Sequence, residues 1–533
     1  MKKYIKISAV LITLMIMAAC GPGPTREDKV SIMIDQVKSP FMIMNSNPKS
    51  LIDKSGAMEG ALPFTQEMLI GFFMDEETTG IDNSVDVQVV MGKSGGFMPE
   101  VYGIFKVKDE PLFIELLETE ANATIKEKDG LKYIIKENDE FVVVWNEEFA
   151  VAGNMTYKLT EVFSNNSDPG MKAVNRIIKM INAVDENEVN ERYSDFLTEE
   201  ADISILFQGK GLYSYLREAS MGQSSEVEEN KESISGVSST MFIDFNEGSL
   251  DMRMSNDLSD KLAAELAFLM TDPVSKGLMA YGNSKDPMMM MGTNINVSEG
   301  LDFVKEKMGV DEYDEVMYEL EELGIDVETF KSALSGEFLI VMDRIEVIER
   351  EIDWGYGEPY ISKEPMPVVG MIMGVEDRET MKSIFPDSLG FDGVVSHKGA
   401  YMVLMDDVFF SSSDSVWAAA VANGKTVALN DPQNVFKERP IGMFLNFLEF
   451  DHLAEMDEAR PLIDLMEYMK LEASAVDVDF SLVFKDKSRN SLRILTETIS
   501  GLMEGEKGAD YKEIEAELEA AAAAEDAFSE GIE

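Results

Sequence analysis

Few side chains in this sequence are suited to nucleophilic or metal chemistry. The chain of 533 residues has one cysteine, Cys20, and two histidines, His397 and His452. The Cys/His ligand sets of zinc sites therefore cannot be assembled, and Cys–His nucleophilic catalysis and dithiol redox chemistry are excluded for the same reason. We expect His397 to lie exposed in a turn and His452 in a polar stretch where a helix begins.

One serine fits a hydrolase pattern. The segment Gly92-Lys93-Ser94-Gly95-Gly96 matches G-x-S-x-G and follows a predicted strand. A nucleophile elbow needs a helix directly after its serine, whereas here Phe97-Met98-Pro99 leads into another strand at Tyr102. A loop between two strands is the favoured interpretation, and a Ser94 hydrolase remains an alternative.

Carboxylates are abundant, so pairs of neighbouring acids carry little information. The sequence contains no calcium-binding D-x-[DN]-x-[DN]-G loop, no Walker A loop and no G-x-G-x-x-G after a strand. No cofactor and no metal site is therefore predicted. A glycosidase-like pair of carboxylates remains an alternative, because it needs only two suitably spaced acids.

Methionine is in excess, with 38 residues. The run Met288–Met291, with Met42, Met44, Met371 and Met373, offers soft thioether ligands of the kind that bind Cu(I). These residues lie on predicted strands, however, and methionine fills irregular cores well, so core packing is favoured. A further alternative is that apolar helices such as the one expected at Met58–Met74 line an adaptable apolar groove.

The cysteine stands at the end of an export signal. Three lysines among the first six residues precede the almost wholly apolar stretch Ile7–Ala19. This stretch is shorter than the about 20 residues that a membrane-spanning helix needs, and the small residues Ala18 and Ala19 lie directly before Cys20, as at a lipoprotein cleavage site. We predict cleavage before Cys20, acylation of that cysteine and stable membrane anchoring. Gly21-Pro22-Gly23-Pro24 follows as a short tether.

The charge balance is strongly acidic. Lysine and arginine number 47 against 100 aspartates and glutamates, a formal net charge of −53. A field of this sign repels nucleic acid, so nucleic-acid partners are excluded. The 45 % of hydrophobic residues still permits large folded cores.

Two halves of the chain repeat one pattern of strands, helices and turns. Paired features begin with the strands near Met42 and Met289 and continue through both halves. The other pairs are the tripeptides Gly80-Ile81-Asp82 and Gly324-Ile325-Asp326, the strands Val85–Val90 and Phe338–Met342, the strands Tyr102–Val107 and Gly370–Val375, the helix caps Thr156 and Ser415, and the hairpins Met241–Phe245 with Ser249–Met254 and Val476–Phe484 with Ser491–Leu495. A period of about 240 residues exceeds that of solenoid repeats, which is about 20 to 50 residues.

The predicted fold is α+β, a tandem duplication of one domain with largely antiparallel sheets covered by helices. The segment 221–235 is expected to be an exposed polar loop. The predicted layout is a signal peptide at 1–19, a tether at 20–30, a first repeat at 31–272, a linker at 273–284, a second repeat at 285–502 and an acidic helical tail at 503–533.

Short signatures resemble a known family. They are Cys20, Lys54-Ser55-Gly56, Gly80-Ile81-Asp82, the stretch Lys128–Tyr133, and Val144-Trp145-Asn146. Together they are similar to the Bacteroidetes lipoproteins grouped as domain of unknown function 4836. The resemblance implies an envelope lipoprotein and supplies no catalytic residue.

These observations lead to three functional expectations. The first is a non-enzymatic envelope lipoprotein with a binding or scaffolding role, held on the membrane through Cys20. The second is a carrier or chaperone for an apolar ligand or an envelope protein, and the third is a hydrolase using Ser94 or a carboxylate pair. We expect the outer membrane as the location. Because Gly21 follows the cysteine and the first acids, Glu27 and Asp28, come later, the periplasmic face is favoured over the cell surface.

Overall fold

The computed structural model describes residues 24–504 apart from short gaps. The gaps are 57–75, 95–97, 120–122, 137–139, 157–167, 221, 223, 309–312, 314–317, 319–326, 353–359, 386–389, 392, 398, 426, 430–434 and 449–459. Several predicted features therefore lie outside the described residues, namely the signal peptide with Cys20, the helix at Met58–Met74, the tripeptide Gly324-Ile325-Asp326, His452 and the tail beyond residue 504.

The described residues form two compact units. One contains the described residues up to Ile52 and those from Glu76 to Phe242, and the other contains Asp53–Gly56 and the described residues from Ile243 onward. The division falls within strand β9 (Val237–Asn246). Each unit is described by itself below.

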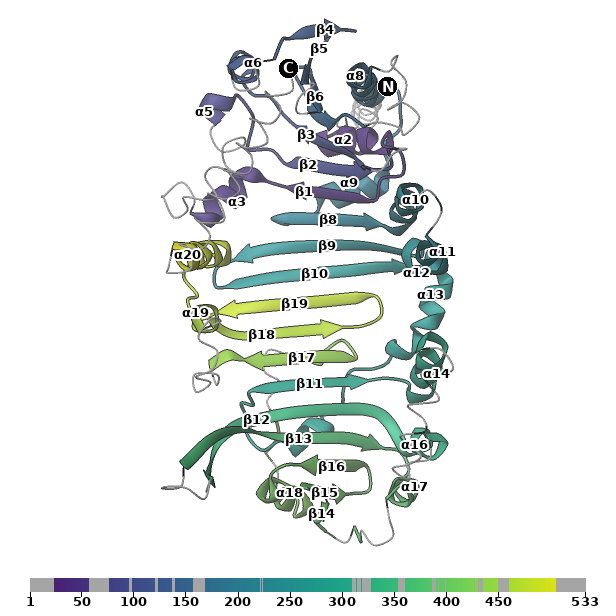
Figure 1. Ribbon diagram of the computed structural model, residues 1–533, viewed down its shortest axis with the longest axis vertical. Coiled ribbons are helices and arrows are strands. Elements are labelled where there is room, and N and C mark those ends of the chain that lie inside the picture. The colour runs from purple at the N-terminus through teal and green to yellow at the C-terminus, as the bar shows by residue number, and fades with distance from the viewer. Residues whose placement is uncertain are drawn as a thin grey trace, which may run out of the picture. The chain divides into compact units, whose positions relative to one another are not determined.

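The first unit has an antiparallel sheet in the order β8-β1-β2-β3-β7-β6-β5-β4 (Figure 1). Its strands are β1 (Met42–Ser46), β2 (Val87–Gly92), β3 (Glu100–Phe105), β4 (Lys126–Lys128), β5 (Leu131–Lys136), β6 (Phe141–Trp145), β7 (Ala150–Asn154) and β8 (Ile203–Gln208). Its helices are α2 (Arg26–Asp35), α3 (Pro48–Ser55, whose last three residues fall in the second unit), α5 (Glu76–Thr79), α6 (Glu110–Thr119), α8 (Pro169–Asn182), η3 (Ala183–Asp185), α9 (Glu191–Thr198), α10 (Gly209–Ala219), α11 (Ser225–Glu229) and α12 (Lys231–Ser235).

Both faces of this sheet carry a core. On one face, side chains of α2, α8 and α9 pack on strand residues such as Ile43 and Val90. On the other face, Phe113 of α6 packs edge to face on Trp145, with ring centroids 5.4 Å apart. The first unit is thus a sheet with helices against both faces.

Helix α2 begins at a capping box. The Thr25 side chain accepts a hydrogen bond from the Asp28 amide at 3.1 Å, and the Asp28 carboxylate accepts one from the Thr25 amide at 2.9 Å. This reciprocal pair satisfies two donors that a helix start leaves free. Because Val30, Met33 and Ile34 of this helix are fully buried, the fold of the first unit begins at Thr25.

The second unit also has an antiparallel sheet, in the order β10-β19-β18-β17-β11-β12-β13-β16-β15-β14, and β9 pairs with β10. Its strands are β10 (Ser249–Leu258), β11 (Met289–Asn294), β12 (Leu334–Ile352), β13 (Tyr360–Val375), β14 (Val395–His397), β15 (Ala400–Leu404), β16 (Val408–Ser412), β17 (Ile441–Asn446), β18 (Met466–Ala473) and β19 (Asp477–Phe484). Its helices are α13 (Asp260–Glu265), η4 (Ala267–Leu269), η5 (Leu278–Tyr281), α14 (Val297–Met308), α16 (Val327–Ala333), α17 (Arg378–Ser383), α18 (Ser415–Ala422), α19 (Arg460–Ile463) and α20 (Ser491–Glu504). The predicted α+β class with largely antiparallel sheets is confirmed.

The pairing order of the two sheets corresponds strand by strand. The order β8-β1-β2-β3-β7-β6-β5 matches β17-β11-β12-β13-β16-β15-β14, and β4 is added at the end of the first. The helices fall at matching places as well. In each sheet one follows the first strand (α3 and α14), one follows the third (α6 and α17), and one follows the last strand of the meander (α8 and α18).

Four local predictions are wrong. Ser491–Leu495 begins helix α20, and β19 forms its hairpin with β18. The described part of 221–235 forms the short helices α11 and α12. The predicted linker 273–284 packs into the core, because Val274, Leu278 and Met279 join a cluster with Trp417. Helix α18 is capped by Asp414, one residue before Ser415.

The matching prediction, that Thr156 caps the next helix, concerns residues 157–167, which lie outside the described residues. The next described helix, α8, begins at Pro169 with Asp168 as its cap. The Thr156 hydroxyl instead accepts hydrogen bonds from the Arg176 guanidinium at 3.3 and 3.4 Å.

Candidate functional site

The most extensive candidate surface is one face of the second sheet, which we call the methionine face. Directly opposed residues of antiparallel strands project from the same face, and this rule aligns three rows across β10, β19, β18, β17, β11 and β12. The rows are Leu250-Leu482-Met469-Leu445-Met289-Met342, Met252-Phe480-Leu471-Met443-Met291-Ile340, and Met254-Val478-Ala473-Ile441-Thr293-Phe338. Apart from Thr293, every member is apolar.

The opposite face of β10, β19 and β18 is polar over two rows. Its rows are Asp251-Ser481-Lys470 and Arg253-Asp479-Glu472. The Asp251 carboxylate accepts a hydrogen bond from the Ser481 hydroxyl at 2.5 Å. Strict alternation of this kind is typical of a sheet with one solvated face and one covered face.

The methionine face is covered at its margins by described side chains. At one side Ile494 and Leu495 of α20 pack with Leu250, Met469 and Phe480. At the other, Met371 and Met373 continue the rows onto β13 and pack beneath α17. None of the hydrophobic clusters formed by described residues includes the central side chains, which are Met289, Met291, Ile340, Met342, Met443, Leu445 and Leu471.

The predicted core role of the methionine run is correct for two of its four members. Met288 and Met290 are buried, and Met290 belongs to the core on the opposite face of the sheet. Met289 is half-buried, and Met291 keeps 41 % of its surface exposed. Because side chains alternate along a strand, the run supplies both the core and the methionine face.

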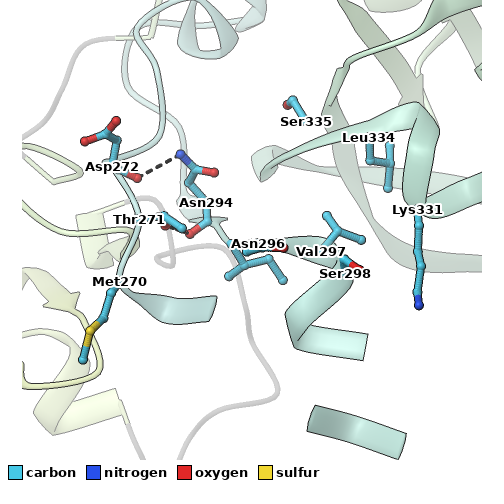
Figure 2. Close-up of a pocket in the computed structure, with 11 residues that line it drawn as sticks. Met270, Thr271, Asp272, Asn294, Asn296, Val297, Ser298, Lys331, Leu334 and Ser335 are labelled. Carbon is cyan, nitrogen blue, oxygen red and sulfur yellow. Dashed lines mark hydrogen bonds between the residues drawn. The ribbon is translucent and has the colours of Figure 1, made fainter. Parts of the chain in front are cut away.

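Two hollows are lined by residues outside the rows of the methionine face. The larger, of about 610 Å³, is polar and lies where α14 begins beside α16 (Figure 2). Its walls are held by the Asn294 side chain, which donates to the Asp272 carbonyl at 2.9 Å, and Lys331 forms ion pairs with Asp302 at 3.5 Å and Glu328 at 3.2 Å. The positive charge of the Lys331 ammonium is thus balanced by two carboxylates.

The smaller hollow, of about 300 Å³, adjoins the serine motif. It is lined by Lys93, whose ammonium donates to the Ser214 hydroxyl at 3.1 Å and pairs with Glu218 at 2.8 Å. Burial, with the nearby charges of Lys38 and Arg217, lowers the pKa of Lys93. This lysine is therefore tied to α10.

Ser94 lies in the loop between two strands, as predicted. Strands β2 and β3 form a hairpin in which Gly92 pairs with Glu100, and Ser94 lies between them. Its side chain is buried, and the hydroxyl donates to the Met98 carbonyl within the same loop. This geometry differs from a nucleophile elbow, which exposes its serine before a helix. His397 is exposed, as predicted, but it is the last residue of strand β14 rather than part of a turn.

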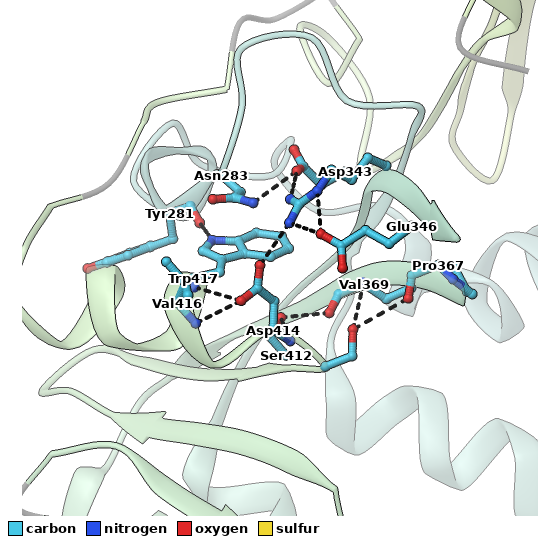
Figure 3. A network of polar contacts seen from close by, with 12 residues as sticks. Tyr281, Asn283, Asp343, Glu346, Pro367, Val369, Ser412, Asp414, Val416 and Trp417 are labelled. Carbon is cyan, nitrogen blue, oxygen red and sulfur yellow. Dashed lines mark hydrogen bonds and ion pairs between the residues drawn. The ribbon is translucent and has the colours of Figure 1, made fainter. Parts of the chain in front are cut away.

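A charged network surrounds Arg344 in the second unit (Figure 3). The guanidinium donates to Asp343 at 2.7 Å, to Glu346 at 3.0 and 2.5 Å, and to Asp414 at 3.1 Å. Burial acts to lower the pKa of Arg344, but the hydrogen bonds that it donates to these carboxylates outweigh burial and raise the pKa. Each of the three carboxylates thus serves as an acceptor for arginine, which suits a structural role.

Two further features are absent from the described part of the chain. Within it, no group of three or more His, Cys, Asp or Glu side chains is placed to hold a metal ion. No helix there has the length and apolar character needed to cross a membrane.

Comparisons with known proteins assign no family and no function to the chain. No protein-family model and no curated protein matches the sequence. Among solved structures, crystal form III of TP0453 is similar with a TM-score of 0.26 and 9 % identity over 46 % of this chain and 88 % of that one. Crystal form I gives a TM-score of 0.25 and 9 % identity over 43 % of this chain and 79 % of that one. At TM-scores this low, neither similarity bears on the fold or the function.

Proposed function

We propose that this protein is a non-enzymatic lipoprotein of the bacterial envelope, anchored through acylated Cys20, with a binding or scaffolding role. The observation that carries the proposal is the distance along the chain between this cysteine and the folded part. The lone cysteine follows an export signal, and the cap of α2 stands at Thr25, five residues later.

Such a tether holds the protein close to the membrane. Gly21–Pro24 supplies four residues, which span at most about 14 Å when fully extended. Because α2 is part of the core of the first unit, that unit would lie against the headgroups. Its role would therefore be exercised at the membrane surface.

We also propose that the two halves arose by duplication of one α+β domain. The matching strand orders and the matching positions of α3 and α14, α6 and α17, and α8 and α18 support this origin. Membership of the domain of unknown function 4836 family is part of the same proposal and rests on the sequence signatures. A duplicated domain offers two related surfaces, as suits a scaffold.

The membrane anchor is tested by Cys20→Ala, with Ser94→Ala as a control that leaves the cysteine in place. We expect the Cys20 variant in the soluble fraction of lysed cells and the control in the membrane fraction. Both variants are followed by immunoblot after a high-salt wash, since acyl chains resist salt whereas electrostatic attachment does not. If Cys20→Ala stayed with the membranes, the anchor would lie elsewhere.

Outer-membrane location, with the periplasmic face favoured, is tested by adding proteinase to intact and to permeabilised cells. The exposed segment around α11 and α12 is the expected cleavage site. We expect cleavage only after permeabilisation. Rapid cleavage of intact cells would instead favour a role at the cell surface.

One observation favours the carrier or chaperone alternative as a second candidate. The methionine face is broad and apolar, and its central side chains belong to none of the hydrophobic clusters formed by described residues. The hydrolase alternative has less support, because the Ser94 side chain is buried.

A further inference from the structure

We infer that the methionine face binds an amphipathic segment of another polypeptide, apolar on one side and cationic on the other. This inference deepens the binding role proposed above and rests on it, but it is independent of the lipid anchor. Three features of the second unit support it, namely the pattern of the rows, their dimensions and the open shape of the face, and the net charge of the whole chain is a fourth argument.

The row pattern requires a cover. In β10 the sequence Leu250-Asp251-Met252-Arg253-Met254 alternates strictly, and β19 repeats this with Val478, Phe480 and Leu482 against Asp479 and Ser481. Over β10, β19 and β18, where the opposite face is polar, the sheet stabilises its fold by burying the apolar rows. On β11 and β12 the opposite face already holds the core with Met290 and Val341. At the centre of the methionine face Met291 is 41 % exposed, and the other central side chains are half-buried without joining a cluster of described residues. The apolar rows therefore continue beyond what the described residues cover.

The dimensions fit a helix. Six neighbouring strands extend over about 24 Å across the sheet, and three rows extend over about 14 Å along the strands. A helix with its side chains is about 10 Å wide and rises 1.5 Å per residue. An amphipathic helix of about 16 residues, laid across the strands, would cover the central methionines.

The open shape of the methionine face argues against a small lipid as its ligand. Ligand sites for small molecules enclose most of the ligand surface. None of the residues that line the two hollows described above, at Lys331 and at Lys93, belongs to the rows of the methionine face. An acyl chain on one face of a sheet would leave its outer side in water, whereas an amphipathic helix would turn its polar side outward.

The negative charge of the chain favours a cationic partner. With a net charge of −53, two copies of this chain repel each other, whereas a cationic segment is attracted. Methionine side chains are flexible and polarizable, and they adapt to partners of different sequence. The expected partner class is thus broad, comprising amphipathic basic segments of envelope or exported proteins.

The test uses the chain from residue 20 onward with Cys20→Ala and two 18-residue helical peptides. One peptide is amphipathic and built from Leu and Lys, and the other has the same pattern with Glu in place of Lys. We expect the Leu/Lys peptide to bind, with an affinity that falls as salt rises from 50 to 500 mM, and the Leu/Glu peptide to bind at least about tenfold more weakly. Fluorescence anisotropy of labelled peptides measures both.

Two lysine variants test whether the peptide binds at the methionine face. Met291→Lys places a charge at the centre of the face, and Met98→Lys makes the same change at an exposed position in the β2–β3 loop of the first unit. We expect Met291→Lys to weaken binding of the Leu/Lys peptide about tenfold and Met98→Lys to leave it unchanged. Thermal melts show whether both variants remain folded, and if Met291→Lys unfolds, Met291→Gln replaces it with a smaller expected loss.

A photo-crosslinker at position 291 completes the test. Crosslinks to the Leu/Lys peptide support the inference. Crosslinks to residues 57–75 of the same chain, despite excess peptide, would overturn it in favour of an internal cover. Equal peptide binding by the two lysine variants, or preferred binding of a fluorescent fatty acid or of phosphatidylcholine vesicles, would overturn it as well.

Discussion

The guanidinium of Arg344 and the carboxylate of Asp414 lie 3.1 Å apart and join a strand to the start of a helix (Figure 3). Arg344 follows an irregularity in the register of β12, after Met342. The second oxygen of Asp414 accepts from the Val416 amide at 2.7 Å and the Trp417 amide at 3.3 Å. One carboxylate thus fixes both the N-terminus of α18 and the position of β12 against it.

Removal of the Asp414 side chain should destabilise the second unit. Asp414→Ala loses the helix cap, which costs about 1 to 2 kcal/mol, and it also removes an acceptor from Arg344. Ser415→Ala is the matched control, because Ser415 is the neighbouring exposed residue and makes no capping bond. Urea unfolding should separate the two variants. Equal midpoints would contradict the assignment of Asp414 as the cap.

A methyl group at Gly370 should also be costly. A Cβ built there would lie 2.3 Å from Cη2 of Trp417, which is fully buried. Overpacking of this kind costs about 1 to 3 kcal/mol, so Gly370→Ala should lower the thermal midpoint of unfolding. Gly103→Ala is the control, because a Cβ at Gly103 meets nothing within 4 Å. A Gly370 variant as stable as the control would show that Trp417 moves freely.

The capping box of α2 should depend on pH. The Ser194 hydroxyl donates to Asp28 at 2.7 Å, and this bond, with the backbone hydrogen bond at Thr25, lowers the pKa of Asp28. Because the pKa is lower in the folded state than the about 3.9 of a free aspartate, the stabilisation is present above about pH 4. It is lost as the pH falls through the folded-state pKa.

Ser194→Ala should therefore raise the pKa of Asp28 toward about 3.9. Carboxyl carbon shifts of labelled aspartate, with Asp28→Asn to identify the signal, report this titration. Ser220→Ala is the control, because that hydroxyl donates to a backbone carbonyl, that of Arg217. An unchanged midpoint in Ser194→Ala would show that this bond does not set the pKa.

Local patterns were sufficient for much of the fold. The alternation in β10 and the turn at Gly248, with φ of 72°, specified the hairpin of β9 and β10. The absence of a helix pattern after Ser94 correctly predicted a loop. In each case the information lies in neighbouring residues, through side-chain periodicity and turn chemistry.

The candidate site was harder to predict. The sequence drew attention to Met288–Met291 but did not show that Met291 would lie opposite Met443 of β17, more than 150 residues later. A signal was available in the alternation of β10 and β19, which marked an apolar face without saying how wide it is. Its extent depends on which strands pair.

The sequence by itself determined the acidic charge, the single cysteine, the α+β class and most strand positions, because these follow from composition and local periodicity. Only the tertiary structure decided that Ser491–Leu495 is helical, that Asp414 rather than Ser415 caps α18, and that the methionines of separate strands form one face. The physical reason is that long-range strand pairing fixes the register, and register determines which side chains share a face.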